Sequence, residues 1–136
     1  MRLIYVSTIT EKFSGVEIEK ILTKSQNNNK KKHISGVLFF NRNNAIQCIE
    51  GSAEAVNELY VKVAQDDRHR AVTLIDYRTV CKREFAQWAM GYVAETAKTK
   101  EILQPFFTTE QFNSYELSSD SAVHLLCALA QQAPIE

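Results

Sequence analysis

The 136-residue chain has the size of one ordinary domain, and its 45% hydrophobic content is typical of a soluble globule. Sixteen lysines and arginines balance sixteen acidic residues, so no global basic field favours nucleic acid as a partner. The chain begins directly in a strand pattern, and its apolar runs are too short to cross a bilayer. We therefore expect no signal peptide, no membrane contact and a cytoplasmic location.

The cysteines and histidines show neither the spacing of a disulfide framework nor that of a metal site. They are Cys48, Cys81, Cys127, His33, His69 and His124. An odd number of widely separated cysteines without a C-x-x-C pair favours small buried thiols in a reducing compartment. We therefore expect no metal site in this chain.

The first third of the chain predicts a strand, a helix and a second strand. Residues 2–7 alternate in the manner of a strand, with Tyr5 on one face. A capping box at residues 14–17 starts a helix whose apolar face ends in the small polar residue Ser25. Residues 33–41 are apolar almost throughout and predict a central strand.

One amide interrupts an otherwise apolar strand at residues 45–50. Alternation places Gln47 and Ile49 on one face of this strand and Ile46 and Cys48 on the other. A buried amide is costly unless its donors and its acceptor are paired. Gln47 therefore either caps a neighbouring backbone group or contacts something bound there, and this strand alone leaves both interpretations open.

The remainder of the chain predicts a helix, two strands and two tail helices. The helix is expected after Ser52, with its end near residues 65–70. The strands are expected at residues 71–81 and 87–93, and the tail helices at 96–107 and 118–132. Ser52 is the expected N-cap of the first of these helices, and Pro105 stops the next one. In the strand at 87–93, Trp88, Met90 and Tyr92 are expected to share a face.

This β-α-β-β-α-β-β order predicts an α+β fold, with a ferredoxin-like sheet and two helices on one face. The two tail helices are amphipathic and have no strand between them, so we expect them to pack on the other face. Residues 1–94 would form the sheet domain, and residues 95–136 a two-helix extension of the same compact unit.

Taken in order, several separated motifs resemble the BLUF domains, which are blue-light sensors that use a flavin. The motifs are Arg2-Leu3-Ile4-Tyr5, Ser25 with Asn28-Asn29, Ile34-Ser35-Gly36-Val37-Leu38, Gln47-Cys48-Ile49-Glu50-Gly51, Asp66-Asp67-Arg68-His69 and Phe85-Ala86-Gln87-Trp88-Ala89-Met90. They cover residues 2–93 in one register, and the tail is similar to the short single-domain BLUF proteins of the PixD type.

The resemblance implies that residues 1–94 hold a flavin between the first two helices, typically FAD, with FMN or riboflavin also able to fit. Tyr5 matches the family's photoactive tyrosine, and Gln47 matches the glutamine between that tyrosine and the flavin ring. Trp88 and Met90 match residues that relay the photoproduct to the surface. The cofactor-binding positions implied are Ser25, Asn28, Asn29, Gln47, Lys62, Asp66, Arg68 and His69.

The implied mechanism is a switch and involves no turnover. Light moves an electron and a proton from Tyr5 to the flavin, and recombination leaves Gln47 in a different hydrogen-bonded form, by rotation, tautomerisation or both. The flavin absorption then shifts slightly to the red. The resemblance implies that the signal leaves through altered contacts with a downstream protein or through self-association.

Four positions depart from the family pattern. His33 stands where glycine is frequent, Ala45 where an aromatic is usual, Ile49 where leucine is usual, and Lys62 where an arginine can touch the flavin tail. Ala45 is expected to loosen the ring pocket, and Lys62 to change the hold on the tail phosphates.

Two other functions compete with the receptor. A flavin-free BLUF-like adaptor would serve only for docking, and would have no need of intact Tyr5, Gln47 and Asn29. A small ferredoxin-like enzyme of the acylphosphatase type would need an oxyanion-binding loop, whereas the four glycines form no phosphate-cradling loop. We therefore expect a receptor without enzymatic activity.

Overall fold

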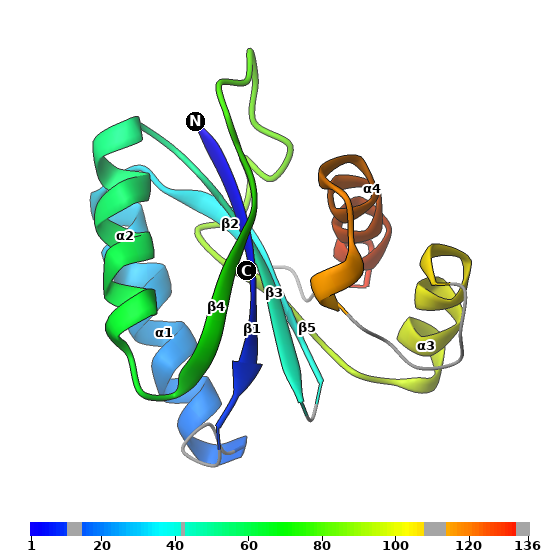
Figure 1. The fold of residues 1–136 in the computed structure, drawn as a ribbon. Helices are drawn as coiled ribbons and strands as arrows, with labels where there is room; N and C mark the ends of the chain where they lie inside the picture. The colour runs from blue at the N-terminus through cyan, green and yellow to red at the C-terminus, as the bar shows by residue number, and fades with distance from the viewer. Residues whose placement is uncertain (11–14, 42, 108–113, 133–136) are drawn as a thin grey trace.

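The computed structural model describes residues 1–10, 15–41, 43–107 and 114–132, without the side chains of residues 15–19. In the described residues the elements are β1 (Arg2–Ile9), α1 (Gly15–Lys31), β2 (Ser35–Phe40), β3 (Asn44–Glu50), α2 (Ala53–Gln65), β4 (His69–Arg78), β5 (Gly91–Ala94), α3 (Ala97–Leu103), two short 3-10 turns (Gln104–Phe106 and Ser114–Glu116) and α4 (Ser119–Ala130). The strands form one sheet in the order β4-β1-β3-β2-β5. Helices α1 and α2 cover one face and α4 the other (Figure 1), which confirms the α+β, ferredoxin-like prediction.

The register of the sheet brings the predicted tyrosine and glutamine side by side. Strands β1 and β3 are antiparallel, and Tyr5 lies opposite Gln47. On the other side of β3, Leu38 of β2 also lies opposite Gln47. Directly opposed residues share a face, so these three side chains form a row on the face that α1 and α2 cover.

The apolar packing on that face is divided between the two helices. Leu3, Ile49 and Val56 belong to a cluster around α2. Leu22 and Leu38 belong to a separate cluster around α1. The sheet between the two clusters carries the Tyr5–Gln47 row, so the polar pair lies where the core is interrupted.

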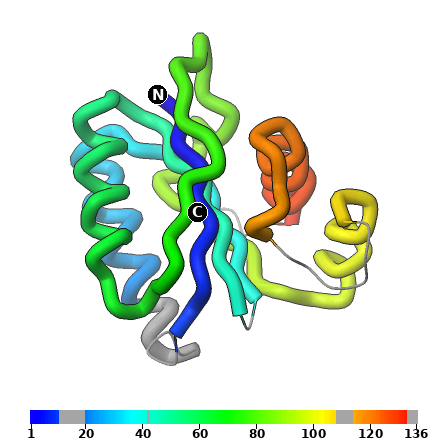
Figure 2. The backbone as a smooth tube through the Cα atoms, viewed as in Figure 1, coloured from blue at the N-terminus to red at the C-terminus, as the bar shows by residue number. Residues whose placement is uncertain are grey.

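The opposite face of the sheet carries the larger core. Side chains of β1 and β3, such as Ile4 and Ile46, pack there against Leu125 and Leu129 of α4. Helix α3 lies outside α4 and packs against it (Figure 2). The prediction that the tail helices cover the second face therefore holds for α4, with α3 stacked beyond it.

The last strand is present as predicted, but it starts four residues later than expected. Strand β5 spans only Gly91–Ala94, and residues 79–90 form a loop without strand or helix. Trp88 and Met90 lie in this loop and do not share a strand face: Met90 packs in the α1 cluster, whereas Trp88 packs on the α4 side. Long-range contacts, in which for example the Gly36 amide donates to the Trp88 carbonyl at 3.1 Å, replace the alternation that the sequence suggested.

Other element boundaries differ by a few residues. Strand β4 starts and ends earlier than expected, at His69 and Arg78. Pro105 lies inside a 3-10 turn that continues α3, and the Ser52 N-cap is confirmed by its bond from the Ala55 amide. The predicted capping box at residues 14–17 has its Ser14 outside the described residues.

Helix α1 ends in a left-handed residue. His33 has φ of 56°, and the Ile34 amide donates to the Asn29 carbonyl at 2.9 Å. This is the Schellman arrangement, in which glycine is the usual residue at the left-handed position. The backbone thus explains why glycine is frequent where this chain has His33.

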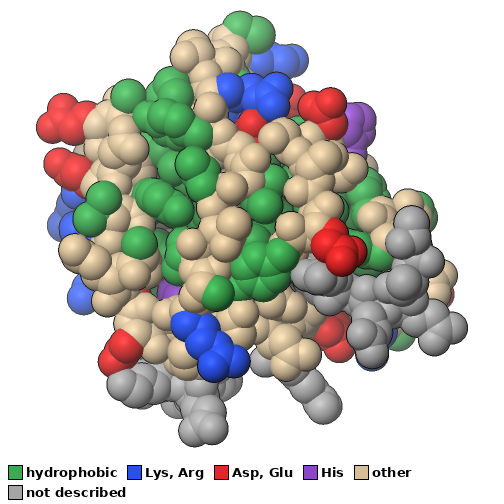
Figure 3. All heavy atoms as spheres, viewed as in Figure 1, with side chains coloured by type: hydrophobic (Ala, Val, Ile, Leu, Met, Phe, Trp, Pro, Cys, Tyr) green, Lys and Arg blue, Asp and Glu red, His purple; other side chains and the backbone are tan. Residues whose placement is uncertain are grey.

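The edge strand β4 exposes part of its apolar surface. Among the described residues, the exposed large hydrophobic residues are Leu74 and Tyr77 on β4 and Val61 on α2. Figure 3 shows hydrophobic side chains, in green, at several places on this face of the molecule. Among the residues described, no helix combines the length and apolar character that a membrane crossing requires.

Candidate functional site

A cleft opens between α1 and α2 above the interruption in the core, with a volume of ≈ 290 Å³. Every site residue that we predicted except Trp88 lines it. The predicted residues in its lining are Tyr5, Ser25, Asn28, Asn29, Gln47, Lys62, Asp66, Arg68, His69 and Met90. Residues from six separate parts of the chain therefore meet at one cavity, whereas Trp88 stacks on Phe85 away from it, with ring centroids 6.2 Å apart.

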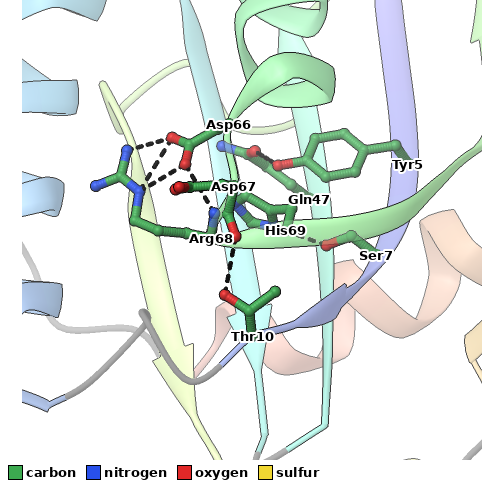
Figure 4. Close-up of polar contacts among 8 residues, drawn as sticks. All are labelled: Tyr5, Ser7, Thr10, Gln47, Asp66, Asp67, Arg68 and His69. Carbon is green, nitrogen blue, oxygen red and sulfur yellow. Dashed lines mark hydrogen bonds and ion pairs between the residues drawn. The ribbon is translucent and has the colours of Figure 1, made fainter.

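A chain of three side chains forms the floor of the cleft. The Tyr5 hydroxyl donates to Gln47 Oε1 (Figure 4), as the register of β1 and β3 allows. Gln47 Nε2 donates to the Met90 thioether sulfur at 3.2 Å. A thioether is a weak acceptor, so the amide is bound strongly on the tyrosine side and weakly on the methionine side.

Tyr5 is buried and keeps its proton. Its side chain is only 1% exposed, and its ring centroid lies 5.9 Å from that of Tyr60 and 6.3 Å from that of His69. Burial raises the pKa of Tyr5 far above its usual range, and the neighbouring Asp66 and Tyr60 add to the increase. The phenol is therefore a fixed hydrogen-bond donor to Gln47 at neutral pH.

Helix α1 holds the loop that carries Met90. Asn29 is buried, and its Nδ2 donates to the Ala89 carbonyl at 2.8 Å. Gln26 Nε2 donates to the Met90 carbonyl at 3.0 Å. These bonds join α1 to the loop, so a displacement of Asn29 in the cleft wall would also displace Ala89 and the adjacent Met90.

An ion pair organises the end of the cleft where α2 stops. The Asp66 amide caps α2 by donating to the Val63 carbonyl, and its carboxylate accepts from both the side chain and the amide of Arg68. The hydrogen bonds from Arg68 lower the pKa of Asp66 to about 2. His69 Nδ1 lies 2.8 Å from Ser7 Oγ, and burial lowers the pKa of His69 while Asp66 opposes the decrease.

Sequence reasoning missed five lining residues. They are Ile21, Lys24, Leu38, Leu59 and Val63. Helical spacing was the signal available for two of them, because Ile21 stands four residues before Ser25 and Lys24 four residues before Asn28 on α1. Lys24 matters most, because together with Lys62 on α2 it gives the cleft a cation on each helix.

The donor set suits a planar polar ring with an anionic tail. Leucine, isoleucine and valine side chains offer apolar walls, while Ser25, Asn29 and Gln47 offer hydroxyl and amide groups. Lys24 and Lys62 supply positive charge for phosphate. No cluster of three or more histidine, cysteine or acidic side chains suited to a metal occurs among the described residues.

A protein-family comparison matches residues 1–91 to the model of BLUF, described as sensors of blue light using FAD. Over 105 residues the chain is 29% identical to the photoactivated adenylate cyclase subunit beta of Euglena longa, covering 76% of this chain and 12% of that protein. It is 32% identical over 77 residues to the blue light- and temperature-regulated antirepressor BluF of Escherichia coli K12, covering 55% and 19%. The chain thus spans only a small part of these relatives.

Two solved structures match almost end to end. BlsA in its photo-activated state superimposes with a TM-score of 0.85 and 27% identity, over 95% of this chain and 93% of that one. The dark-state structure of the BLUF protein BlrB superimposes with a TM-score of 0.77 and 26% identity, over 96% and 95%. Both similarities include the tail helices that lie beyond the family model.

Proposed function

The chain belongs to the BLUF family, and we propose that it is a blue-light receptor whose flavin ring lies in the cleft between α1 and α2. The observation that carries the proposal is the Tyr5–Gln47–Met90 chain on the cleft floor. It joins a buried phenol, an amide with a weakly held end, and a loop residue at one cavity. Such an arrangement suits a switch, because a change in the hydrogen bonds of the Gln47 amide alters its contact with Met90 in the loop before β5.

Tyr5 is the proposed electron and proton donor. A bound flavin would supply blue-light absorption and, when excited, an acceptor for one electron. Removal of an electron from Tyr5 makes its phenol strongly acidic, and the hydroxyl already points at Gln47 Oε1. The proton therefore has a path through the Gln47 side chain, and returns to Tyr5 when the electron returns.

Gln47 is the proposed bistable element. In the described arrangement its oxygen faces Tyr5 and its nitrogen faces Met90. A reversed amide would exchange these partners, and the bond it would give up at Met90 is a weak one. A changed hydrogen bond is worth about 1 kcal/mol net, which can bias a loop contact without refolding the domain.

We propose FAD as the cofactor, with FMN as a weaker ligand. Ser25, Asn28 and Asn29 would bind the ring, and Lys24 and Lys62 the phosphates at the cleft mouth. Arg68 would act less directly, because it is paired with Asp66. FAD carries two phosphates and FMN one, so the two lysines should bind FAD more tightly than FMN. Riboflavin has no phosphate and would make no ionic contact with them.

The proposed output is a contact with a protein partner or with a second copy of the chain, without catalysis by this domain. The Escherichia coli relative is named an antirepressor and the Euglena relatives are cyclase subunits, and in both the matched segment is a minor part. The free thiols of Cys48, Cys81 and Cys127 agree with a reducing, cytoplasmic compartment.

Replacement of Tyr5 by phenylalanine tests the proposal. We expect Tyr5→Phe to keep flavin bound and to abolish the light-induced red shift, because only the hydroxyl donor is lost. Tyr60→Phe is the matched control, since its ring lies 5.9 Å from that of Tyr5 and makes no part of the cleft lining. A normal red shift in Tyr5→Phe, measured by absorption before and after illumination, would refute the assignment.

A further inference from the structure

A second hollow lies on the outer side of the loop that carries Met90. It has a volume of ≈ 530 Å³ and is open to solvent. We call it the Arg83 hollow and define it by Lys30 and His33 at the end of α1, Ile34, and Arg83, Ala86, Gln87 and Ala89 of the loop, with Ser35 beneath. It shares no lining residue with the flavin cleft.

The charged side chains that line the Arg83 hollow are both cationic, and the carboxylate of Glu50 is buried beneath Arg83. Lys30 and Arg83 come from different elements, and no acidic residue is in the lining. Glu84, next to Arg83 in the chain, has its charge near Cys127 on the α4 side; burial first and then Glu84 raise the pKa of that thiol. Glu58 on α2 pairs instead with Lys32, at 3.0 Å.

Arg83 is held in place from below. Its Nη1 donates to Ser35 Oγ at 3.1 Å, and Ser35 Oγ donates to Glu50 Oε1 at 3.3 Å. Glu50 is completely buried and also accepts from the amides of Glu84 and Phe85, at 2.6 and 2.8 Å. A positioned guanidinium loses less side-chain entropy on binding than a free lysine does, so this cation is prepared for a ligand.

Two connections lead from the Arg83 hollow to the flavin cleft, and both run through the Met90 loop. Gln47 Nε2 donates to the thioether sulfur of Met90, which follows Ala89 directly in the chain. Ala89, in the wall of the hollow, accepts the hydrogen bond from Asn29 of the cleft. A change at either Gln47 or Asn29 therefore reaches a group that shapes the hollow.

We propose that the Arg83 hollow docks an acidic segment of a protein partner, and that docking is coupled to the state of Gln47. The docking of an acidic segment is inferred from the charge and shape of the hollow, whereas its coupling to Gln47 rests on the proposed function. A run of carboxylates can reach both cations while its methylene groups lie against Ile34 and Ala86. The hollow is open to solvent and its two cations come from different elements, so an extended segment can contact both.

The test uses the flavin-loaded full-length protein and a fluorescently labelled hexaglutamate peptide, with hexalysine as the opposite-charge control. Fluorescence anisotropy measures binding in the dark and under continuous blue light, at two salt concentrations. We expect saturable, salt-sensitive binding of hexaglutamate only, with a dissociation constant that changes about fivefold on illumination. By reciprocity, saturating peptide should change the equilibrium between lit and dark forms and hence the dark recovery rate.

Three variants locate the contact. Arg83→Gln should weaken hexaglutamate binding by about tenfold, and Lys30→Gln, which leaves the Ser35–Glu50 bonds intact, by about threefold. Lys82→Gln is the matched control, because Lys82 is exposed, adjacent to Arg83 and absent from the lining. Equal losses in Lys82→Gln and Arg83→Gln, or no saturable binding by the wild type, would overturn the docking site.

Further outcomes separate the parts of the proposal. Inorganic phosphate that competes with the peptide and reproduces its effect on recovery would replace the acidic segment by a simple anion, and would overturn the proposed partner. Binding that is identical in dark and light, with a normal red shift, would overturn the coupling and leave the photoreceptor function intact. A missing red shift would instead refute the proposed function, while the anisotropy arm still decides on docking.

Discussion

Replacement of Glu50 by glutamine should weaken the whole protein, because this buried carboxylate anchors the Met90 loop. Its two oxygens accept from the amides of Glu84 and Phe85 and from the Ser35 hydroxyl. An amide group presents only one acceptor, so one main-chain N–H loses its partner and faces an NH₂ group. A charge-assisted hydrogen bond contributes about 1.5–3 kcal/mol, and an unpaired buried donor costs a comparable amount.

We therefore expect Glu50→Gln to lower the free energy of unfolding by about 3 kcal/mol, which corresponds to a decrease in Tm of about 10 °C. Urea unfolding followed by tryptophan fluorescence is the assay, since Trp88 is the single tryptophan and stacks on Phe85 in the same loop. Glu84→Gln is the control with the same chemical change at an exposed side chain. Unfolding of Glu50→Gln within 0.5 kcal/mol of the control, about the error of such comparisons, would refute the anchor.

Three further predictions concern the backbone and the acid range. His33→Gly should raise the free energy of unfolding by about 0.5–1 kcal/mol in urea titrations, because the φ of 56° suits glycine. The folded-state pKa of about 2 for Asp66 lies below its ordinary 3.8, so its stabilisation is present above pH 3.8 and is lost as pH falls towards 2. After solvent screening, the contribution of Asp66 to the free energy of unfolding is about 1 kcal/mol. Urea titrations should therefore find Asp66→Asn less stable than the wild type by this amount at neutral pH, and equally stable near pH 2. Gly36→Ala places Cβ 2.0 Å from the Cys48 carbonyl oxygen and should cost about 3 kcal/mol or prevent folding, whereas Gly51→Ala meets nothing closer than 3.4 Å and should fold normally.

Local patterns predicted the core of the sheet because they are caused by local chemistry. The alternation around Gln47 follows from the strand itself, whereas its register with Tyr5 comes from the long-range pairing of β1 with β3. The interruption of the apolar strand made Gln47 a candidate, and only the family resemblance decided between a backbone cap and contact with a bound group. The stated resemblance supplied the remaining positions, and all of these except Trp88 meet at the cleft.

The misplaced fifth strand has a physical cause that the sequence does not display. The loop before β5 is shaped by Glu50, Asn29 and Gln26, which are 34 to 64 residues away along the chain. Periodicity reports only neighbours within a few residues, so Trp88 and Met90 resembled a strand face. Their opposite placement follows from contacts with two different cores.

The role of Lys24 was missed for a similar reason. On the sequence it is one lysine among several on the first helix, and a solvated position is the usual interpretation. Only the approach of α1 to α2 pairs Lys24 with Lys62 at one cavity. The signal available was that Lys24 stands four residues before the predicted Asn28, and it becomes informative only once the cleft is known.

The central claim is that a flavin in this cleft reports the hydrogen bonds of Gln47. The most direct test is the absorption spectrum of the purified, flavin-supplemented protein, recorded in the dark, after blue light and again after a dark interval. The account predicts a flavin band that shifts slightly to the red and returns in the dark. A protein that takes up no flavin, or a flavin band that stays unchanged by light, would contradict it.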